Sequence, residues 1–259
     1  MFGICNLSVV PCRAEASDRS EMVTQLLFGE RFRILEEQGS WCKIKIAEDG
    51  YECWIGAKQF FPISGSTFIE LEKSKSIYSY ELVQAICNKS TDQVFPIVLG
   101  STLPNFKNST LSFENQVYAY EGLTNQNMPT FSRAALIENA YLYLHAPYLW
   151  GGKSPFGIDC SGFTQMVFKL NGKLLKRDAY QQAEEGETLS FLEEAEEGDL
   201  AFFDNEDGKI IHVGIVLKEF KIIHASGKVR IDSLDHEGIF NSETQKYSHR
   251  LRLIKRMVT

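Results

Sequence analysis

A cysteine between two polar residues is the first sign of chemistry in this sequence. Cys160 lies in the stretch FGIDCSGF (156–163), with Asp159 before it and Ser161 after it. The pattern predicts a helix that begins near Cys160 and is capped by Asp159, so the sulfur would lie beside free backbone N–H groups. The helix dipole favours negative charge there, which would lower the pKa of the thiol and make it a nucleophile. Taken alone the signal is weak, because a cysteine at a helix start is more often structural.

Two histidines in neighbouring strand-like runs are candidates for a base and its orienting partner. In IIHVGIVL (210–217) the odd-numbered apolar residues are expected to face the core, which leaves His212 on the opposite face. In KIIHAS (221–226) the same alternation separates His224 from the core-facing residues. A hairpin centred on Lys218 would place the two histidines directly opposite each other, with Cβ atoms about 4.5–5.5 Å apart. With Cys160 they would form a Cys-His-X triad, whereas the alternative is that each is an ordinary half-exposed strand residue.

The elements that would position these residues begin after the polar linker TNQNMPT (124–130). Ser132 is expected to cap a helix over 133–144. The second helix has apolar residues at i, i+3, i+4 and i+7 from Phe163, and Asn171-Gly172 ends it. Three strand-like runs follow it (199–203, 210–217 and 221–226). Helices first and an antiparallel sheet afterwards predict an α+β fold for this part of the chain.

The first 125 residues are expected to be all β. The hairpin WCKIKI–AEDG–YECWI alternates apolar and polar residues, and its Cys42 and Cys53 are interpreted as plain core residues. Residues 63–125 repeat this texture in FIELEKSKSIYSYELVQAI, QVFPIVLGST and LSFENQVYAYEG. The sequence therefore predicts three domains, which are two small β barrels over 1–62 and 63–126 and an α+β domain over 127–259.

Composition excludes several classes of protein. The net charge of −7 argues against a nucleic-acid partner, which would require a basic face. No stretch approaches the roughly 18 apolar residues that span a bilayer, and the first residues lack the pattern of a signal peptide. We therefore expect a cytoplasmic monomer with no membrane partner. Its six cysteines, without a C-x-x-C pair, are expected to be reduced thiols rather than disulfides or zinc ligands. The acidic block over 184–199 is expected to be a solvated loop or surface helix.

Three motifs, taken in order, resemble those of the NlpC/p60 cysteine peptidases. They are PYLWGG (147–152) leading to DCSGF (159–163), then HVGI (212–215), then IHAS (223–226). Members of that family are bacterial enzymes with a papain-like fold that cut cell-wall peptides. The resemblance implies that Cys160 is the nucleophile, His212 the base and His224 the polar third member. It also implies that Tyr148 helps to stabilise the oxyanion and that no metal or cofactor takes part.

The N-terminal region, most clearly SVVPCRAEASDRSEMVTQLLFGE (8–30), resembles bacterial SH3-like domains. Two such domains before this catalytic domain are similar to the arrangement in the γ-D-glutamyl-L-diamino-acid endopeptidases of murein-peptide recycling. Those enzymes release L-Ala-γ-D-Glu from peptides whose L-Ala amine is free. The resemblance makes a murein peptide the expected substrate.

The same resemblance implies a set of substrate-binding residues. Asp159 and Ser161 would receive the free amino terminus of the substrate. The segment RDAYQQ (177–182) resembles the family's R-D-S/A-x-x-Q, which adds Arg177 and Asp178, although Ala179 stands where a serine often occurs. The first SH3-like domain of related enzymes adds an acid and a tyrosine, for which the candidates by motif position are Glu21 and Tyr51.

Three other functions remain open from the sequence. The chain would be a murein-binding protein if its third domain were inert. It would be a general cell-wall hydrolase if it accepted peptides still attached to the sugar. The same triad would also serve acyl transfer to an acceptor other than water.

Overall fold

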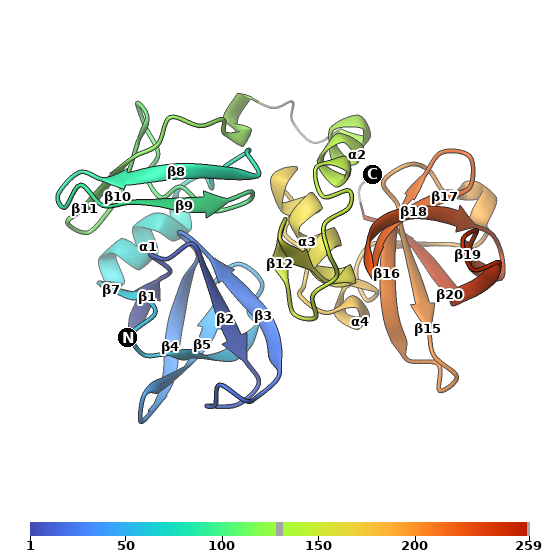
Figure 1. Ribbon diagram of the computed structural model, residues 1–259, viewed down its shortest axis with the longest axis horizontal. Coiled ribbons are helices and arrows are strands. Elements are labelled where there is room, and N and C mark those ends of the chain that lie inside the picture. The colour runs from blue at the N-terminus through green and yellow to red at the C-terminus, as the bar shows by residue number, and fades with distance from the viewer. Residues whose placement is uncertain (128–131, 258–259) are drawn as a thin grey trace. The chain divides into compact units, whose positions relative to one another are not determined.

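The computed structural model describes residues 1–127 and 132–257, so the last residues of the predicted linker lie outside the described part. Contacts divide the chain into two units, each consisting mostly of strands (Figure 1). Unit 1 contains Met1–Met128 and Trp150–Pro155, and unit 2 contains Pro129–Leu149 and Phe156–Thr259. The division into three domains remains a prediction, while the contacts group the first two of them in one unit.

Unit 1 contains a seven-stranded sheet in the order β3-β2-β6-β5-β4-β1-β7 and a four-stranded sheet in the order β10-β11-β8-β9. The strands of the first sheet are β1 (Phe2–Ile4), β2 (Val9–Arg13), β3 (Met22–Leu27), β4 (Arg31–Gln38), β5 (Trp41–Ile46), β6 (Glu52–Gly56) and β7 (Phe61–Ile63). Those of the second are β8 (Val83–Asn88), β9 (Val94–Val98), β10 (Thr110–Phe113) and β11 (Gln116–Ala119). Short segments of unit 1 outside these sheets are α1 (Gly65–Lys73), η1 (Asn125–Asn127) and β12 (Lys153–Ser154).

The predicted hairpin of unit 1 is confirmed. Strands β5 and β6 pair from Trp41↔Gly56 to Lys45↔Glu52, and Cys42 and Cys53 both lie in the apolar core beneath them. A second apolar cluster joins residues from the first 63 positions, such as Phe28, to residues of the four-stranded sheet. Side chains from both sheets therefore share one core.

The expectation of strands throughout 63–80 is wrong, because this stretch contains helix α1. Ser64 caps the helix by accepting a hydrogen bond from the Thr67 N–H, and Phe68 and Leu71 are its buried residues. Their i, i+3 spacing marks one helical face, so the cap and the period together outweigh the β-branched texture.

The segment Trp150–Pro155 is bound into unit 1 although its neighbours in sequence belong to unit 2. The Lys153 ammonium donates to both carboxylate oxygens of Glu30, at 3.0 and 3.2 Å, and both side chains are almost fully buried. The Lys153 N–H also donates to Gln25 Oε1 at 2.8 Å. Gly151 adopts φ +75°, and a Cβ there would lie 2.3 Å from the Met22 carbonyl oxygen, so this backbone contact requires glycine.

Unit 2 is built of a seven-stranded antiparallel sheet in the order β14-β20-β15-β16-β17-β18-β19, with helices packed against it. Its helical segments are α2 (Arg133–Tyr141), α3 (Cys160–Leu170), α4 (Ala179–Gln182) and η2 (Leu192–Glu194). Its strands are β13 (Gly157–Ile158), β14 (Glu187–Leu189), β15 (Leu200–Asp204), β16 (Ile210–Leu217), β17 (Lys221–Ser226), β18 (Lys228–Leu234), β19 (Gly238–Asn241) and β20 (Lys246–Arg256). The predicted helix–sheet order is therefore confirmed.

Both predicted helices of unit 2 begin where their caps indicated. Ser132 accepts from the Ala135 N–H, although α2 ends at Tyr141, three residues before the expected end. Helix α3 begins at Cys160 after Asp159 and is followed by Gly172 at φ +84°. Every residue of α3 is buried, because the helix packs against α2 on one side and against β16 and β17 on the other.

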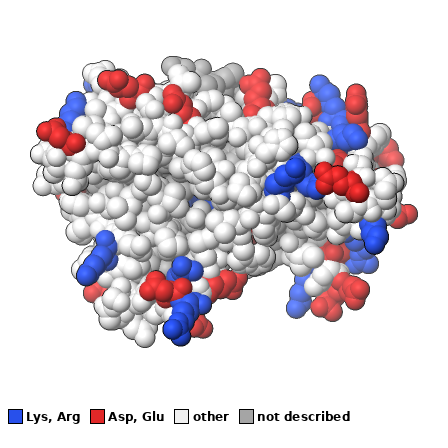
Figure 2. All heavy atoms as spheres, in the orientation of Figure 1, with Lys and Arg blue, Asp and Glu red and all other residues white. Residues whose placement is uncertain are grey.

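Charged side chains of both signs occur together on the face drawn in Figure 2. The acidic block over 184–199 forms β14, η2 and turns, and most of its residues are exposed or half-buried. Asp199 is an exception, since it is buried and paired with Arg133 and Arg256. Among the described residues, no helix is long and apolar enough to cross a membrane.

Candidate active site

Cys160 is the first residue of α3 and lies at its N-terminus, as the sequence predicts. Asp159 caps the helix by accepting the Gly162 N–H at 2.6 Å. The thiol side chain is 8% exposed, and the backbone N–H groups of Val213 and Ser161 hydrogen-bond to its sulfur. Because Val213 directly follows His212, this contact places the thiol beside the strand that carries the predicted base.

The resting thiol is not ionised, contrary to the expectation from the helix dipole. Burial raises the pKa of Cys160 to about 12, and the Asp159 carboxylate acts in the same direction. The two backbone N–H groups and the Arg177 guanidinium oppose this effect without reversing it. Desolvation of a sulfur enclosed between a helix and a sheet outweighs the effect of the helix dipole. The thiol therefore needs a base to remove its proton.

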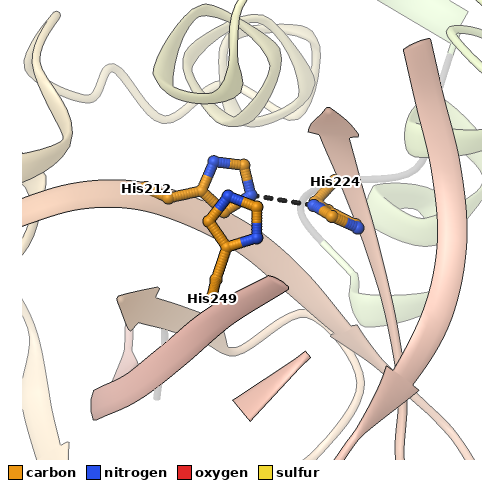
Figure 3. Close-up of side chains that lie close together, drawn as sticks. All are labelled: His212, His224 and His249. Carbon is orange, nitrogen blue, oxygen red and sulfur yellow. Dashed lines mark hydrogen bonds between the residues drawn. The ribbon is translucent and has the colours of Figure 1, made fainter. Parts of the chain in front are cut away.

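His212 and His224 meet, but not in the predicted register. The pairing is Gly214↔His224 and Leu217↔Lys221, so the hairpin is centred one residue later than expected and His212 lies diagonal to His224. The turn residues Glu219 and Phe220 have φ of +57° and +51°, which is the two-residue turn with left-handed backbone at both positions. A shift of two positions keeps both histidines on one face, and the His212 Nε2 and His224 Nδ1 atoms are 2.8 Å apart (Figure 3).

The faces of β16 also differ from the prediction. Ile211 was expected in the core but is 53% exposed, whereas His212 is 4% exposed. Both faces of this strand are covered from His212 onward, since every residue to Leu217 is buried. The alternation therefore assigned the histidines to one face correctly but did not reveal that this face is interior.

Asp232 on β18 is a fourth member that the sequence reasoning missed. Its Oδ2 lies 3.0 Å from His224 Nε2, and its Oδ1 accepts from Arg230 Nη2 at 3.0 Å. Burial alone would raise the pKa of Asp232, but hydrogen bonds from His224 and Arg230 outweigh it and lower the pKa. The carboxylate is thus ionised and accepts a hydrogen bond from His224 Nε2–H.

This carboxylate sets the tautomers of both rings. A neutral His224 that donates from Nε2 has its lone pair on Nδ1, and so it accepts from His212 Nε2–H. His212 then keeps its own lone pair on Nδ1, the ring nitrogen that is not bonded to His224. Burial holds the pKa of His212 well below its usual value, and His249 and His224 act in the same direction, so the ring is a neutral base.

Three rings surround His212. The His249 ring from β20 stacks on it at 4.0 Å between centroids and 20° between planes, while the His224 ring meets it edge-on at 5.0 Å (Figure 3). Phe203 from β15 lies 5.7 Å away. His249 was not predicted, because its place in the sequence, YSHRL, carries no motif and its strand pairs with distant segments.

The three histidines are also the candidate metal ligands of unit 2, since their ligand nitrogens lie within 4.8 Å of one another. Imidazole suits Zn²⁺ and Cu²⁺. However, an ion bound by imidazole lies close to the plane of each ring, and the His212 and His249 rings are stacked almost parallel. Two of the nitrogens also already share a hydrogen bond. The arrangement is that of a hydrogen-bonded relay.

A buried ion pair adjoins the nucleophile. Arg177 donates from Nη1 to Asp159 Oδ1 at 3.1 Å and from Nη2 to Oδ2 at 2.6 Å. Its Nη1 also donates to Ser161 Oγ at 2.9 Å. Gln182 braces the same turn, since its Nε2 donates to the Ser161 carbonyl at 3.0 Å. The structure thus brings together Asp159, Ser161 and Arg177, and it shows that the Asp159 carboxylate is already paired.

The remaining predicted residues of unit 2 have separate positions. Tyr148 is half-buried, and burial, with the Cys160 and Asp159 side chains acting in the same direction, raises the pKa of its hydroxyl to about 12. It therefore stays a hydrogen-bond donor. Asp178 caps α4 in a capping box with Gln181, which gives it a structural role in this fold.

Glu21 and Tyr51 lie in unit 1. Glu21 Oε1 accepts from the Trp150 indole N–H at 2.6 Å. Tyr51 packs against the apolar core of the seven-stranded sheet, and its N–H donates to Asp49 Oδ1 at 2.9 Å. Their assignment to substrate binding remains a prediction.

Comparison with known proteins bears on the whole chain. The model of the NlpC/P60 family matches residues 145–248, and that of the bacterial dipeptidyl-peptidase SH3 domain matches residues 12–60. A Bacillus subtilis protein named gamma-D-glutamyl-L-lysine dipeptidyl-peptidase is 32% identical over 225 residues, which cover 78% of this chain and 71% of that protein. The chain belongs to the NlpC/P60 family. The resemblance stated from the motifs is therefore confirmed, and the chain is an NlpC/P60 peptidase with a β-rich, SH3-like N-terminal region.

One further relative supports this assignment to the NlpC/P60 family, and one solved structure shares the fold. The Lysinibacillus sphaericus protein named dipeptidyl-peptidase 6 is 29% identical over 252 residues, which cover 86% of this chain and 88% of that protein. The crystal structure of an NlpC/P60 family protein from Bacillus cereus covers all of this chain and all of its own, with a TM-score of 0.83 and 18% identity. At that identity it shows that the fold is shared.

Proposed function

We propose that this NlpC/P60 peptidase hydrolyses the γ-D-glutamyl–diamino-acid bond of murein peptides that carry a free N-terminal L-Ala. Two relatives, the Bacillus subtilis protein and a Bacillus cereus protein 27% identical over 237 residues, are named for action on γ-D-glutamyl-L-lysine peptides. The proposal includes a role in cell-wall peptide recycling and a cytoplasmic location. The observation that carries it is the buried relay from Asp232 through His224 to His212, on the strand whose next residue, Val213, contacts the Cys160 sulfur.

The relay supports general-base activation of Cys160. As the sulfur attacks the γ-glutamyl carbonyl carbon, the thiol proton passes to His212 Nδ1, the nitrogen left unprotonated by the bond to His224. The imidazolium then gives this proton to the leaving amine and a thioester remains. Water, deprotonated by the same ring, cleaves the thioester and releases L-Ala-γ-D-Glu. Asp232 stays ionised and stabilises the positive charge through His224.

The oxyanion formed in both steps has two candidate donors. One is the backbone N–H of Cys160 in the first turn of α3, which has no partner within the helix. The other is the Tyr148 hydroxyl, which remains protonated because its pKa is raised to about 12. Donors fixed before the reaction stabilise the developing charge without reorganisation.

The cluster of Asp159, Ser161 and Arg177 supports recognition of a charged peptide terminus. Asp159 Oδ2 accepts from Arg177 Nη2 at 2.6 Å, and Ser161 Oγ accepts from Arg177 Nη1 at 2.9 Å, so both oxygens lie together at the start of α3. A substrate ammonium would bind to Asp159 Oδ2 and to Ser161 Oγ. Arg177 neutralises the charge of Asp159. Specificity for the substrate ammonium therefore rests on its hydrogen bonds to Asp159 Oδ2 and Ser161 Oγ, and on a second carboxylate if the protein supplies one.

The test compares the free tripeptide L-Ala-γ-D-Glu-diaminopimelate with the same peptide acetylated at L-Ala. Acetylation removes the ammonium and with it the charge-assisted contacts to Asp159 and Ser161, so kcat/KM should fall at least about a hundredfold, or roughly 2.7 kcal/mol. Cys160→Ala should abolish cleavage, while Cys87→Ala, which removes a half-buried thiol of unit 1, should leave it unchanged. Comparable rates for both peptides would contradict the recycling role and favour a general cell-wall hydrolase. Absence of any Cys160-dependent cleavage would favour an inert, murein-binding third domain.

A further inference from the structure

His249 is a half-buried ionisable group that the mechanism above does not use. It lies on β20, its Nδ1 is 2.9 Å from Ser248 Oγ, and its ring covers one face of the His212 ring at 4.0 Å. The His224 ring meets His249 edge-on at 5.9 Å. Residue 249 follows directly after the segment matched by the family model, which ends at 248.

We propose that His249 is a positioning residue, whose ring fixes the plane of His212 so that Nδ1 is directed to Cys160 while Nε2 keeps its bond to His224. The inference rests on the proposed role of His212 as the base. It adds the requirement that a stacked aromatic ring, rather than the hydrogen bond alone, holds this base in place.

One hydrogen bond does not define a ring plane. The χ2 torsion of histidine is broad, so a ring held only through Nε2 can turn about that bond and move Nδ1 out of line with the sulfur. A ring stacked at 20° and 4.0 Å opposes this turn from one face. Phe203, 5.7 Å from His212 and 6.0 Å from His249, packs against both rings.

The charge of His249 matters as well as its shape. During the reaction His212 becomes an imidazolium, and a neutral ring face attracts a cation whereas a protonated ring repels it. The other ionisable groups around the pair are Cys160 from α3, His224 from β17, and Asp232 with its partner Arg230 from β18. Burial lowers the pKa of His249 to about 4, and His224 acts in the same direction against the opposite effect of Asp232. The stacked ring is therefore neutral over the range in which His212 works.

The experiment compares His249→Ala with His249→Phe, which retains a stacking ring but has no nitrogen. Kinetics with the free tripeptide should show kcat lowered about tenfold in the Ala variant, with KM changed less than twofold. The Phe variant should regain kcat to within about threefold of the unsubstituted enzyme. His236→Ala is the matched control, because this exposed histidine pairs with Glu193 on the surface, and its kcat should not change.

The pH profile separates positioning from general damage to the fold. In His249→Ala water reaches His212 and relieves its desolvation, so the acid limb of kcat/KM should move up toward the ordinary histidine pKa of about 6.5. In His249→Phe the ring still shields His212 from water and only the electrostatic effect of His249 is lost, so the limb should move up less than in His249→Ala. Equal kcat in all three proteins, or a Phe variant as impaired as the Ala variant with both acid limbs unmoved, would overturn the inference.

A second readout does not depend on the substrate. The rate at which iodoacetamide alkylates Cys160 reports proton removal from the thiol, so it should fall in the Ala variant and recover in the Phe variant. If the tripeptide is not cleaved but alkylation follows this pattern, the proposed function fails and the positioning role stands. If the tripeptide is cleaved but neither readout responds to His249→Ala, the positioning role fails and the proposed function stands.

Discussion

Asp232→Asn should strongly lower the kcat of the peptidase while the protein remains folded. Arg230 Nη2 donates to Asp232 Oδ1, whereas its Nε lies 2.8 Å from Oδ2 without the geometry of a hydrogen bond. An asparagine would therefore keep its oxygen at the Oδ1 position, where the hydrogen bond is, and turn its NH₂ group toward His224 Nε2. His224 would then have to accept at Nε2 and carry its proton on Nδ1. That proton would donate to His212 Nε2, which forces the His212 proton onto Nδ1, the nitrogen that has to receive the thiol proton. The base is lost through a change of tautomer.

The size of the loss follows from the role of the group. General-base catalysis contributes about 10²–10⁴-fold, so kcat should fall by that factor, or about 2.7–5.4 kcal/mol of barrier. Steady-state kinetics with the free tripeptide measure it, and thermal unfolding should show that the protein remains folded. Asp204→Asn is the matched control, because this buried aspartate of the same sheet pairs with Arg250 instead of a histidine. Its kcat should stay within about threefold.

A second substitution tests the tautomer argument itself. In Asp232→Asn with Arg230→Met, no guanidinium holds the amide oxygen, so the amide is free to turn and accept from His224 Nε2–H. Part of the lost kcat should return. A single variant within threefold of the unsubstituted enzyme, or a double variant less active than the single one, would refute the reasoning.

Three other substitutions or conditions test separate parts of the structure. Gly214→Ala places a Cβ 2.8 Å from the His224 Cβ, so kcat should fall at least tenfold, and a crystal structure should show a displaced His224 ring; an undisturbed ring with full activity would contradict this. Glu30→Gln removes the counter-charge of the Lys153 ammonium, which is 2% exposed, and should lower the free energy of unfolding in urea by about 3–5 kcal/mol. A loss below about 1 kcal/mol would contradict the argument from burial. Because the pKa of His212 is lower in the folded protein than in the unfolded chain, its contribution to stability is complete above about pH 6.5 and declines below that value. The acid limb of kcat/KM should have its midpoint below about pH 6.5, and a midpoint above that value would show that the His212 ring is not desolvated.

Local signals in the sequence identified the elements of unit 2 and most of the residues at the nucleophile. Asp159 as a cap, the i, i+3, i+4 spacing after it and the alternation in 210–217 and 221–226 are features of contiguous segments, and the helix and strands begin where these features indicate. Propensity and period act over a few residues, so a single sequence reveals them.

Register and burial could not be predicted in the same way. The turn between β16 and β17 uses Glu219 and Phe220 with left-handed backbone, and neither residue type signals such a turn. The slip of two positions preserved the face, so the histidines still met. A slip of one would have separated them.

The partners drawn from distant strands were missed for a related reason. Asp232 and His249 join the relay through β18 and β20, and the order of these strands is a property of the whole sheet. Arg177 was assigned to substrate from the motif, whereas the structure shows that it also pairs with Asp159 across 18 positions of sequence. The prediction of a low pKa for the Cys160 thiol was wrong because desolvation depends on every residue that encloses the sulfur, and these residues come from distant parts of the sequence.

The segment Trp150–Pro155 has a consequence for how such proteins recombine. Since it belongs to unit 1 while residues 149 and 156 belong to unit 2, the chain passes between the units three times. A single cut near residue 130 would release a catalytic fragment that carries Lys153 without Glu30, so this ammonium, 2% exposed in the whole chain, would lose both its counter-charge and the residues that bury it. A gene fusion that exchanges residues 1–127 alone would separate residue 153 from Glu30 and Gln25, the side chains that bind it in this fold. A graft that moves unit 1 between family members therefore has to move 1–127 and 150–155 together.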